Sequence, residues 1–415
     1  MAVEGRTFNA EHCVVISIAD VQAAKKRIKS GIYYSPCPFS GQLSEITGMQ
    51  IYCKLDHLQR TGSFKERGAR NALLQLAPDR KARGVVAASA GNHALGLAYH
   101  GKLLGIGVTV VMPETAPLIK ITTCQRLGAR VLVDGQDFAG AKARGDQLVR
   151  AEGLTYIHGY DDWQIVAGQG TMGLEILDQV PNLDAILVPV GGGGLIAGVA
   201  LAIKHLRPQV QVIAVEAEHT PSFRLALERG EPVPVTNQPT LADGLAVPIV
   251  GSNAFAVARG LIDSLVIVSE EQIALAILRI LELEKSVVEG AAAATLAALL
   301  AGKVPELAGR NVVLPFCGGN IDPAILNRVI DRGLVADGRL CRLVATISDR
   351  PGGLAAFARV IASVGASVKD ITHDRTFGSE EISAVRVVCT VETRDRAHAA
   401  ELKSALEKRG FRCEA

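Results

Sequence analysis

A lysine in a glycine-containing turn is the most reactive group in the sequence. Lys65 lies in the run Thr61–Ala69, where Gly62, Ser63 and Phe64 precede it and a stretch with helical period follows. Its amine should therefore lie near a helix N-terminus, where the helix dipole disfavours a cation. A neutral lysine amine is a nucleophile that forms Schiff bases. A single lysine is more often a solvated surface residue, so this interpretation depends on further motifs.

A turn of small residues follows the first apolar strand after that lysine. Residues 88–93 read Ala-Ser-Ala-Gly-Asn-His and precede a helical stretch, 94–104. Such a turn exposes backbone N–H groups, and the Asn92 amide can hydrogen-bond a phenolic or carboxylate oxygen. An ordinary turn with an asparagine cap is the alternative. The substrate contacts that we predict in this turn are Ser89, Ala90, Gly91, Asn92 and His93.

A run of four glycines follows a later apolar strand and precedes another helix. Such a loop lets the backbone wrap around an anion, while the helix N-terminus adds partial positive charge. A purely structural turn of four glycines is disfavoured by its entropic cost. The sequence therefore predicts a phosphate site, formed by Gly191, Gly192, Gly193, Gly194 and Leu195.

The same loop fits a second interpretation. Gly192, Gly194 and Ala197 match the dinucleotide fingerprint, and Glu216 lies 22 residues after Gly194, at the end of the next strand. An acid in that place binds a ribose hydroxyl. An NAD-binding oxidoreductase is therefore an alternative, although it gives the lysine and the asparagine turn no role.

Cysteines supply a fourth motif and a constraint on location. Cys317 lies in the glycine turn after the strand 311–314, where a thiol can face a heteroaromatic ring nitrogen, although a cysteine after a strand is more often inert core. The chain has 8 cysteines, Cys13 among them, with no C-x-x-C and no adjacent histidine pair. Neither a metal site nor a disulfide framework is predicted, and a reducing cytoplasm fits.

The elements that must position these residues read as parallel sheets covered by helices. From about 50 to 330, short β-branched runs alternate with longer segments of helical period. Predicted strands cover 84–87, 108–111, 130–133, 185–190, 212–215 and 311–314. The first three form a group, which predicts two open parallel-sheet α/β units, a large one (1–52 and 161–330) and a small one (53–160). A cleft between them is the expected site.

The composition and periodicity of the sequence change in the C-terminal part. Residues 331–339 are polar, contain two glycines and show no regular period, so we predict a linker there. Residues 340–415 read as a separate α+β ferredoxin-like domain. Its predicted strands cover 343–347, 367–373 and 382–391, its helices 354–364 and 394–409, and 411–413 is available as an edge strand.

Composition narrows the class of partner. The formal net charge is +2, from 44 basic and 42 acidic side chains without long runs, which favours neither nucleic acid nor an anionic membrane as a partner. The apolar stretch Val14–Ile18 has its charges in the wrong order for a signal peptide, and other apolar stretches are too short to span a bilayer. We expect a small-molecule substrate and a homodimer or homotetramer.

Taken together and in this order, the four motifs resemble those of the fold-type II pyridoxal-phosphate (PLP) enzymes, in the threonine dehydratase and serine racemase branch. The resemblance covers about residues 20–325 and implies a tryptophan synthase β-like fold. It implies that Lys65 holds PLP as a Schiff base, that Asn92 binds its 3′-oxygen, that residues 191–195 bind its phosphate and that Cys317 meets its ring nitrogen. It also assigns three further residues to the lining of the cofactor site: Phe64, Gly244 and Glu289.

The resemblance implies an L-threonine ammonia-lyase that also uses L-serine. Alternatives are an ammonia-lyase for another β-hydroxy amino acid, such as serine or 3-hydroxyaspartate, a serine racemase, and an amino-acid sensor without activity. Racemases of this branch carry a serine, their second acid/base, where Ala90 stands, which disfavours racemisation. Their metal motif begins at a position that matches Glu216, but Ser222 replaces its aspartate.

The C-terminal segment resembles an ACT regulatory domain, with residues 349–354 (Asp-Arg-Pro-Gly-Gly-Leu) as its signature turn. In relatives this module pairs with a copy of itself and often binds an amino acid. The resemblance therefore implies an amino-acid effector, and a plain oligomerisation module is the alternative.

Overall fold

The computed structural model describes residues 16–375 and 383–414, which form two compact units. The first unit contains the chain up to Ile273 and Ile280–Ile321, and the second contains Ala274–Arg279 and the chain from Asp322. The predictions that concern Cys13, the stretch beginning at Val14 and the strand residue Ile382 fall outside the described residues.

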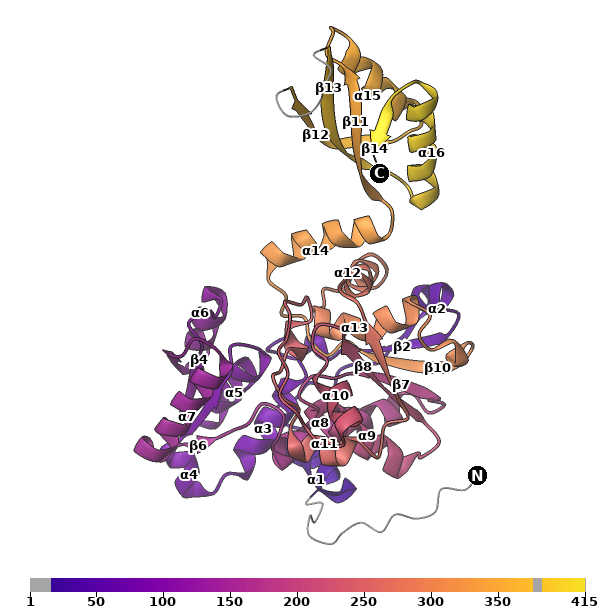
Figure 1. The fold of residues 1–415 in the computed structure, drawn as a ribbon. Coiled ribbons are helices and arrows are strands. Elements are labelled where there is room, and N and C mark those ends of the chain that lie inside the picture. Colours follow the sequence, from indigo (N-terminus) through magenta and orange to yellow (C-terminus); the bar gives the residue numbers. More distant parts are fainter. Residues whose placement is uncertain (1–15, 376–382, 415) are drawn as a thin grey trace. The chain divides into compact units, whose positions relative to one another are not determined.

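A larger sheet of six strands forms one part of the first unit (Figure 1). All neighbouring strands are parallel except β1 and β2. Strand β7 is buried at every residue, which matches its unbroken apolar sequence, because a parallel sheet with helices on both faces exposes neither side. The strands are, in sheet order, β1 (Phe39–Ser40), β2 (Gln50–Lys54), β10 (Asn311–Pro315), β7 (Ala185–Pro189), β8 (Gln211–Ala217) and β9 (Ser264–Val268). The helices are α1 (Ile18–Ile28), α2 (Gly41–Thr47), α8 (Trp163–Gln179), α9 (Gly194–Leu206), α10 (Ser222–Arg229), α11 (Ser252–Ala258) and α13 (Gly290–Leu300). Helix α12 (Glu270–Arg279) begins in the first unit, and its residues from Ala274 belong to the second. Short 3₁₀-helices are η1 (Asp56–Leu58), η2 (Asp243–Leu245) and η4 (Pro305–Leu307), and η3 (Ile280–Glu284) is a short π-helix.

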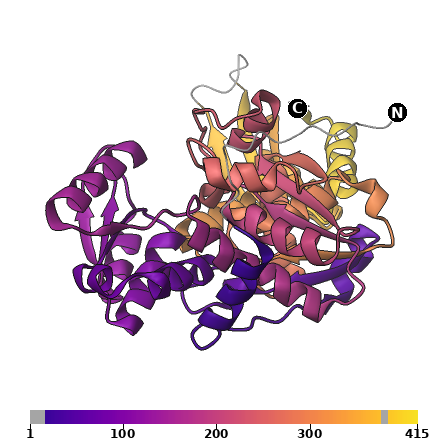
Figure 2. The same cartoon turned by 90° about the horizontal axis from the view of Figure 1, so that it is seen from below.

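A smaller sheet of four parallel strands forms the other part of this unit, seen from a second side in Figure 2. Its strands are, in sheet order, β5 (Arg130–Val133), β4 (Val108–Met112), β3 (Val85–Ala88) and β6 (Thr155–Tyr156). Its helices are α3 (Lys65–Gln75), α4 (Pro78–Arg83), α5 (Asn92–Leu104), α6 (Leu118–Arg126) and α7 (Phe138–Glu152). The predicted parallel-sheet α/β class is confirmed. The exact domain boundaries stay a prediction.

Helix α8 joins the two parts because α3 and α9 both pack closely against it. A Cβ atom at Gly168 would lie 2.6 Å from the Gly68 Cα, so α3 and α8 meet at paired glycines. A Cβ atom at Gly198 would lie 2.5 Å from the Gly170 nitrogen, so α9 and α8 meet in the same way. The helix that starts at Lys65 and the helix that follows the four glycines are therefore held by one buried helix.

A buried ionic network holds the start of α3. The Arg67 guanidinium donates to Asp56 Oδ2 at 2.6 Å and to Glu175 Oε1 at 2.7 Å, and it is 0% exposed. Lys54 donates to the second oxygen of Glu175 at 2.6 Å. Each charge has an opposite charge and hydrogen bonds, which is the condition for keeping ions in a core. The network connects β2, η1, α3 and α8 next to Lys65.

The second unit contains a four-stranded antiparallel sheet with ferredoxin-like topology, in the order β12–β13–β11–β14. Phe357, Leu402 and Leu406 from its helices are buried in its core. This sheet is compatible with the predicted ACT-like domain. The elements are α14 (Pro323–Ala336), β11 (Leu340–Ser348), α15 (Gly353–Ser363), β12 (Ser367–Asp374), β13 (Ala384–Glu392), α16 (Arg396–Lys408) and β14 (Arg412–Glu414).

The prediction that residues 331–339 are irregular is wrong in its first part, since α14 continues to Ala336. Asp322 caps this helix through the backbone N–H of Ala324 at 2.8 Å. Gly333 suggested a break, but it is buried within the helix. The chain leaves the helix at Gly338, which has a φ of +76°.

Candidate active site

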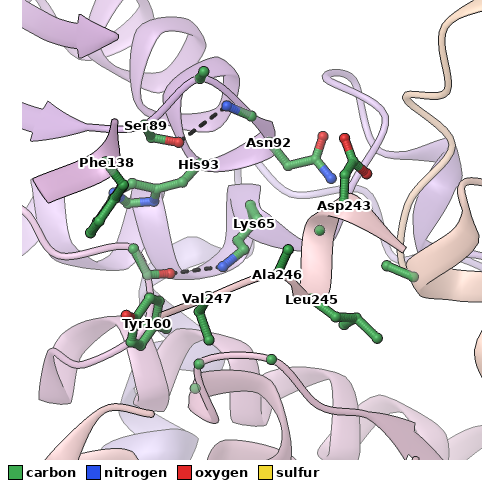
Figure 3. Close-up of a pocket in the computed structure, with 18 of the residues that line it drawn as sticks. Lys65, Ser89, Asn92, His93, Phe138, Tyr160, Asp243, Leu245, Ala246 and Val247 are labelled. Atoms are coloured by element: carbon green, nitrogen blue, oxygen red, sulfur yellow. Dashed lines mark hydrogen bonds between the residues drawn. The ribbon is translucent and has the colours of Figure 1, made fainter. Parts of the chain in front are cut away.

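A cavity of about 420 Å³ lies in the first unit, and every residue predicted for the site lines it (Figure 3). This volume is within the range of small-molecule and cofactor sites. The four motifs are far apart in the sequence, so the fold brings them together. The predicted residues that line it are Phe64, Lys65, Ser89, Ala90, Gly91, Asn92, His93, Gly191, Gly192, Gly193, Gly194, Leu195, Gly244, Glu289 and Cys317.

Lys65 is the first residue of α3, and its side chain points into the cavity between the turn of Ser89 and the segment of Tyr160 (Figure 3). Its Nζ donates a hydrogen bond to the carbonyl oxygen of Gly159 at 2.8 Å. Burial lowers the pKa of this amine to about 8 and outweighs the opposing charge of Glu289. The amine is therefore a nucleophile near neutral pH, and burial is the dominant cause rather than the helix dipole.

The turn before Lys65 is tied to the turn after β10. Ser63 forms an antiparallel bridge with Gly318, and the Phe64 N–H donates to the Cys317 carbonyl at 2.9 Å. Gly62 has a φ of +79°, a conformation that glycine adopts without strain. These contacts place the thiol of Cys317 beside the lysine.

The thiol of Cys317 is neutral. Cys317 is 2% exposed, and burial raises the pKa of its thiol well above the usual value, with a further rise from the Glu289 carboxylate. A neutral thiol is a weak hydrogen-bonding group toward a ring nitrogen and carries no charge that would hold a proton there.

The four glycines pack tightly against two other segments at the start of α9. A Cβ atom at Gly192 would lie 2.3 Å from Tyr160 Cγ, and one at Gly191 would lie 2.8 Å from the Leu245 Cα. Gly193 caps the helix with a φ of +92°. The first N–H groups of a helix have no intrahelical acceptor, so this loop presents donors and a positive dipole end to the cavity.

Asn92 and Glu289 form a hydrogen bond within the cavity wall. Asn92 is the first residue of α5, and its Nδ2 donates to Glu289 Oε1 at 2.8 Å. Burial raises the pKa of the Glu289 carboxyl to about 7, and the charge of Asp243 raises it further, while the bond from Asn92 lowers it. This acid therefore titrates near neutral pH.

The remaining members of the asparagine turn differ in their environment. Ser89 Oγ accepts from the Gly91 N–H at 3.2 Å, which shapes the turn. His93 is 4% exposed, and its Nε2–H donates to the Ile157 carbonyl at 3.1 Å. Burial, and then the charge of Lys65, lower the pKa of His93 to about 3, so its ring is neutral.

Glu216 does not line the cavity. Its carboxylate accepts from the backbone N–H groups of Phe223 at 2.6 Å and Arg224 at 3.0 Å, at the start of α10, and the side chain is 0% exposed. It therefore stabilises a helix start and is not presented to a ligand in the cavity. This contact removes the feature that favoured an NAD-binding oxidoreductase.

Several lining residues had no signal in the sequence. Phe138 and Tyr160 add aromatic surface, and Lys120 from α6 forms an ion pair with Asp243 at 3.3 Å. These residues belong to no recognisable motif, and only the packing of the two sheets brings them to the cavity. Tyr160 lies in the segment that separates the two sheets.

The described part of the chain contains neither a cluster of metal-binding side chains nor a membrane-spanning helix. In residues 16–375 and 383–414, no three histidine, cysteine or acidic side chains are grouped as a metal ion requires. In the same part of the chain, no helix combines the length and the apolar character needed to cross a membrane. The seven cysteines in this part are free thiols.

The donor set fits a phosphorylated pyridine aldehyde. The lysine amine suits an aldehyde carbon, the glycine loop suits a phosphate, the Asn92 amide suits a ring hydroxyl and the neutral thiol suits a ring nitrogen. The close approach of Tyr160 to Gly192 also shows that the loop is built without room for side chains of its own.

Comparison with known proteins agrees with this fit. Residues 28–318 match the family model described as pyridoxal-phosphate dependent enzyme. An L-threonine ammonia-lyase of Thermotoga maritima is 41% identical over 397 residues, which cover 96% of this chain and 98% of that protein. The processed form of threonine deaminase isoform 2 from Solanum lycopersicum has a TM-score of 0.73 at 36% identity, over 76% of this chain and 92% of that one. A serine racemase from Dictyostelium discoideum has a TM-score of 0.70 at 35% identity, over 74% and 99%.

Proposed function

The chain belongs to the pyridoxal-phosphate dependent enzymes, and on that premise we propose that it is an L-threonine ammonia-lyase that also accepts L-serine. The observation that carries the proposal is the Lys65 amine, with its lowered pKa, in one cavity with the glycine loop and the neutral Cys317 thiol. The reaction converts threonine to 2-oxobutanoate and ammonia, and serine to pyruvate and ammonia. The enzyme is a carbon–nitrogen lyase.

The cofactor contacts follow from the wall of the cavity. When bound, pyridoxal phosphate supplies an electron-withdrawing ring that stabilises negative charge at the substrate Cα. Lys65 would bind its aldehyde carbon, the N–H groups of residues 191–195 would hold its phosphate, and Asn92 would donate to its ring hydroxyl. Cys317 would supply the group next to its ring nitrogen. All of these residues line the cavity. Phe64, Gly244 and Glu289 complete the lining.

Lys65 moves the proton in the elimination. The free amine of Lys65 would take the Cα proton of the bound substrate, and a pKa of about 8 suits both uptake and release near neutral pH. The Gly159 carbonyl is within hydrogen-bond distance of this amine and helps to orient it. The proton taken by Lys65 would pass to the hydroxyl as the Cβ–O bond breaks, so that the hydroxyl leaves as water, and one water would be consumed when the C–N bond is hydrolysed to release ammonia.

Substrate orientation is assigned to the turn 89–93, whose N–H groups and Asn92 amide suit a carboxylate. Ala90 lines the cavity and carries no proton donor or acceptor on its side chain. With Lys65 as the base on one side and no second acid at position 90, the site supports elimination better than racemisation. This difference separates the proposal from serine racemase.

The test is release of 2-oxo acid by the purified protein with pyridoxal phosphate. We expect 2-oxobutanoate from L-threonine in many turnovers, no product from Lys65→Ala, and normal product from the matched control Lys142→Ala. Lys142 lies on α7, pairs with Asp146 at 2.8 Å and does not line the cavity. A protein that leaves threonine intact but turns over serine or 3-hydroxyaspartate would overturn the choice of substrate, and full activity of Lys65→Ala would overturn the lysine assignment.

The second unit completes the proposal. We assign to it a regulatory or oligomerising role, with an amino acid such as isoleucine or valine as effector, since its ferredoxin-like sheet is compatible with an ACT-like domain. A homo-oligomer and a cytoplasmic location belong to the same proposal. The activity assay repeated with isoleucine or valine tests the effector, and an unchanged dependence of rate on threonine would refute it.

A further inference from the structure

We propose that Asn320 is a positioning residue that fixes the amide of Asn92, so that Asn92 presents an N–H rather than a carbonyl oxygen to the ring hydroxyl of the cofactor. The inference rests on the proposed function. Asn320 follows β10 in the turn that carries Cys317, and the motifs in the sequence gave it no role.

The first step is the set of hydrogen bonds around Asn320. Its Nδ2 donates to Asn92 Oδ1 at 2.8 Å and to the Thr61 carbonyl at 2.7 Å. Asn92 Nδ2 in turn donates to Glu289 Oε1 at 2.8 Å. The backbone of Asn320 also lowers the pKa of the Glu289 carboxyl. The three side chains therefore form a continuous chain of hydrogen bonds, from Asn320 through Asn92 to Glu289, behind the cavity lining.

The hydrogen bonds to Asn320 and Glu289 decide which way the Asn92 amide faces. An asparagine Nδ2 can only donate, so the atom of Asn92 that meets Asn320 must be the oxygen. Glu289 accepts one of the two N–H bonds of Asn92, and its second N–H remains for a ligand. A ring hydroxyl that ionises needs a donor, because a donor stabilises the charged form.

The same side chain holds the turn that carries the lysine. Thr61 begins that turn, and a Cβ atom at Gly62 would lie 2.4 Å from Asn320 Oδ1. Glycine is therefore required at position 62 both by its φ of +79° and by the approach of Asn320. One amide thus sets the geometry of Asn92 and of the lysine turn.

The test replaces Asn320 by aspartate, which accepts hydrogen bonds but does not donate them when ionised. Asn92 must then turn its Nδ2 toward position 320 and its oxygen toward the ring hydroxyl. In the Asn320→Asp holoenzyme we expect the pH midpoint of the visible absorbance of the bound cofactor to rise by on the order of one unit. The dissociation constant for pyridoxal phosphate should rise about tenfold.

Two matched variants separate the amide flip from the added charge. Asn92→Ala removes the amide, so adding Asn320→Asp in that background should shift the midpoint by less than half as much. Asn320→Ala removes the side-chain donor without offering an acceptor, so Asn92 keeps only its bond to Glu289 and the midpoint should rise by less than in Asn320→Asp. If Asn320→Asp does not fold, a double-mutant cycle of cofactor affinity with Asn320→Ala and Asn92→Ala replaces it, and we expect non-additive losses.

The outcomes are distinct. An equal midpoint shift with and without Asn92, a shift in Asn320→Ala as large as in Asn320→Asp, or additive losses in the cycle would overturn the positioning role. A wild-type protein that binds no pyridoxal phosphate would instead overturn the proposed function. The spectroscopic midpoint does not depend on turnover, so the two failures cannot be confused.

Discussion

The lowered pKa of the Lys65 amine predicts how fast the cofactor-free protein captures pyridoxal phosphate as the pH changes. Only the neutral amine attacks an aldehyde. A pKa of about 8 leaves roughly one amine in ten neutral at pH 7, whereas the ordinary value of 10.5 leaves roughly one in 3,000. Burial therefore gives Lys65 about a 300-fold larger reactive fraction than a solvated lysine.

The assay mixes cofactor-free protein with a small excess of pyridoxal phosphate, reduces the product with borohydride after short times, and quantifies the Lys65 peptide by mass spectrometry. We expect the rate to rise with pH to a midpoint near 8 and to level off above about 9. Lys120 lines the same cavity, so the fraction of label on its peptide serves as an internal comparison.

Two matched substitutions test which groups set the pKa of Lys65. The charge of Glu289 raises the pKa of Lys65, so Glu289→Gln should move the midpoint to lower pH. Glu216→Gln is the matched control, because Glu216 is also buried with a pKa raised to about 7 but lies outside the cavity. A wild-type midpoint near 10, or equal shifts in the two variants, would refute the reasoning.

Three further predictions concern the walls of the site. Gly192→Ala places a Cβ atom 2.3 Å from Tyr160 Cγ, so the ring or the loop must move, and a cofactor titration should show affinity about tenfold lower or worse. Arg67→Met leaves the buried Asp56 without its ion-pair partner and Glu175 with Lys54 alone, so it should lower the free energy of unfolding by about 3–5 kcal/mol in urea denaturation. His93 has a pKa lowered to about 3 from 6.5, so the unfolded chain binds the extra proton and stability is lost as the pH falls below 6.5. By pH 4 the loss reaches on the order of 3 kcal/mol, and it should be absent from His93→Gln.

Each of these has an outcome that would contradict it. Unchanged cofactor affinity in the Gly192 variant would mean that the Tyr160 ring moves away from the new Cβ atom at no cost in binding free energy. A loss below about 1 kcal/mol in the Arg67 variant would mean that the carboxylates take up protons or water without penalty. The acid effect must be measured as the difference between wild type and His93→Gln, because the raised pKa values of Glu216 and Glu289 give stability that declines as pH rises through the same range.

Much of the fold and of the site could be predicted from local patterns. Each predicted strand between 84 and 314 corresponds to an observed one. β3, β4 and β7 are buried on both faces, which requires a continuous run of mostly apolar residues, whereas β5 is only partly buried. The lysine turn and the glycine loop could also be predicted locally. Glycines with positive φ and the residues at a helix start determine the backbone shape over only a few residues. Strands β1, β2, β6 and β9 were not predicted. β1 and β6 have only two residues each, and β2 has polar residues at both ends. β9 is an apolar run from Leu265 to Val268, so its sequence did carry the signal.

Motif spacing and composition failed at two positions. Glu216 has the spacing of a ribose-binding acid, but its carboxylate accepts from the first N–H groups of α10, seven and eight residues further along the chain. Gly333 suggested a break, but it packs against Ala274 and Leu278, and α14 continues to Ala336. The spacing of Glu216 does not show where its carboxylate points, and the partners of Gly333 are far away in the sequence.

The sequence by itself determined which chemical groups this protein can use: an amine, an asparagine amide, a glycine-rich anion loop and a thiol, each on a short turn whose shape its own residues dictate. Only the tertiary structure decided that they share one cavity, that burial lowers the pKa of Lys65 to about 8, and that Asn320 connects Thr61 to Asn92. The physical reason is the distance along the chain between the residues that interact. A turn depends on neighbours in the chain, whereas burial and hydrogen bonds between residues far apart in sequence depend on how α3, α8 and α9 pack.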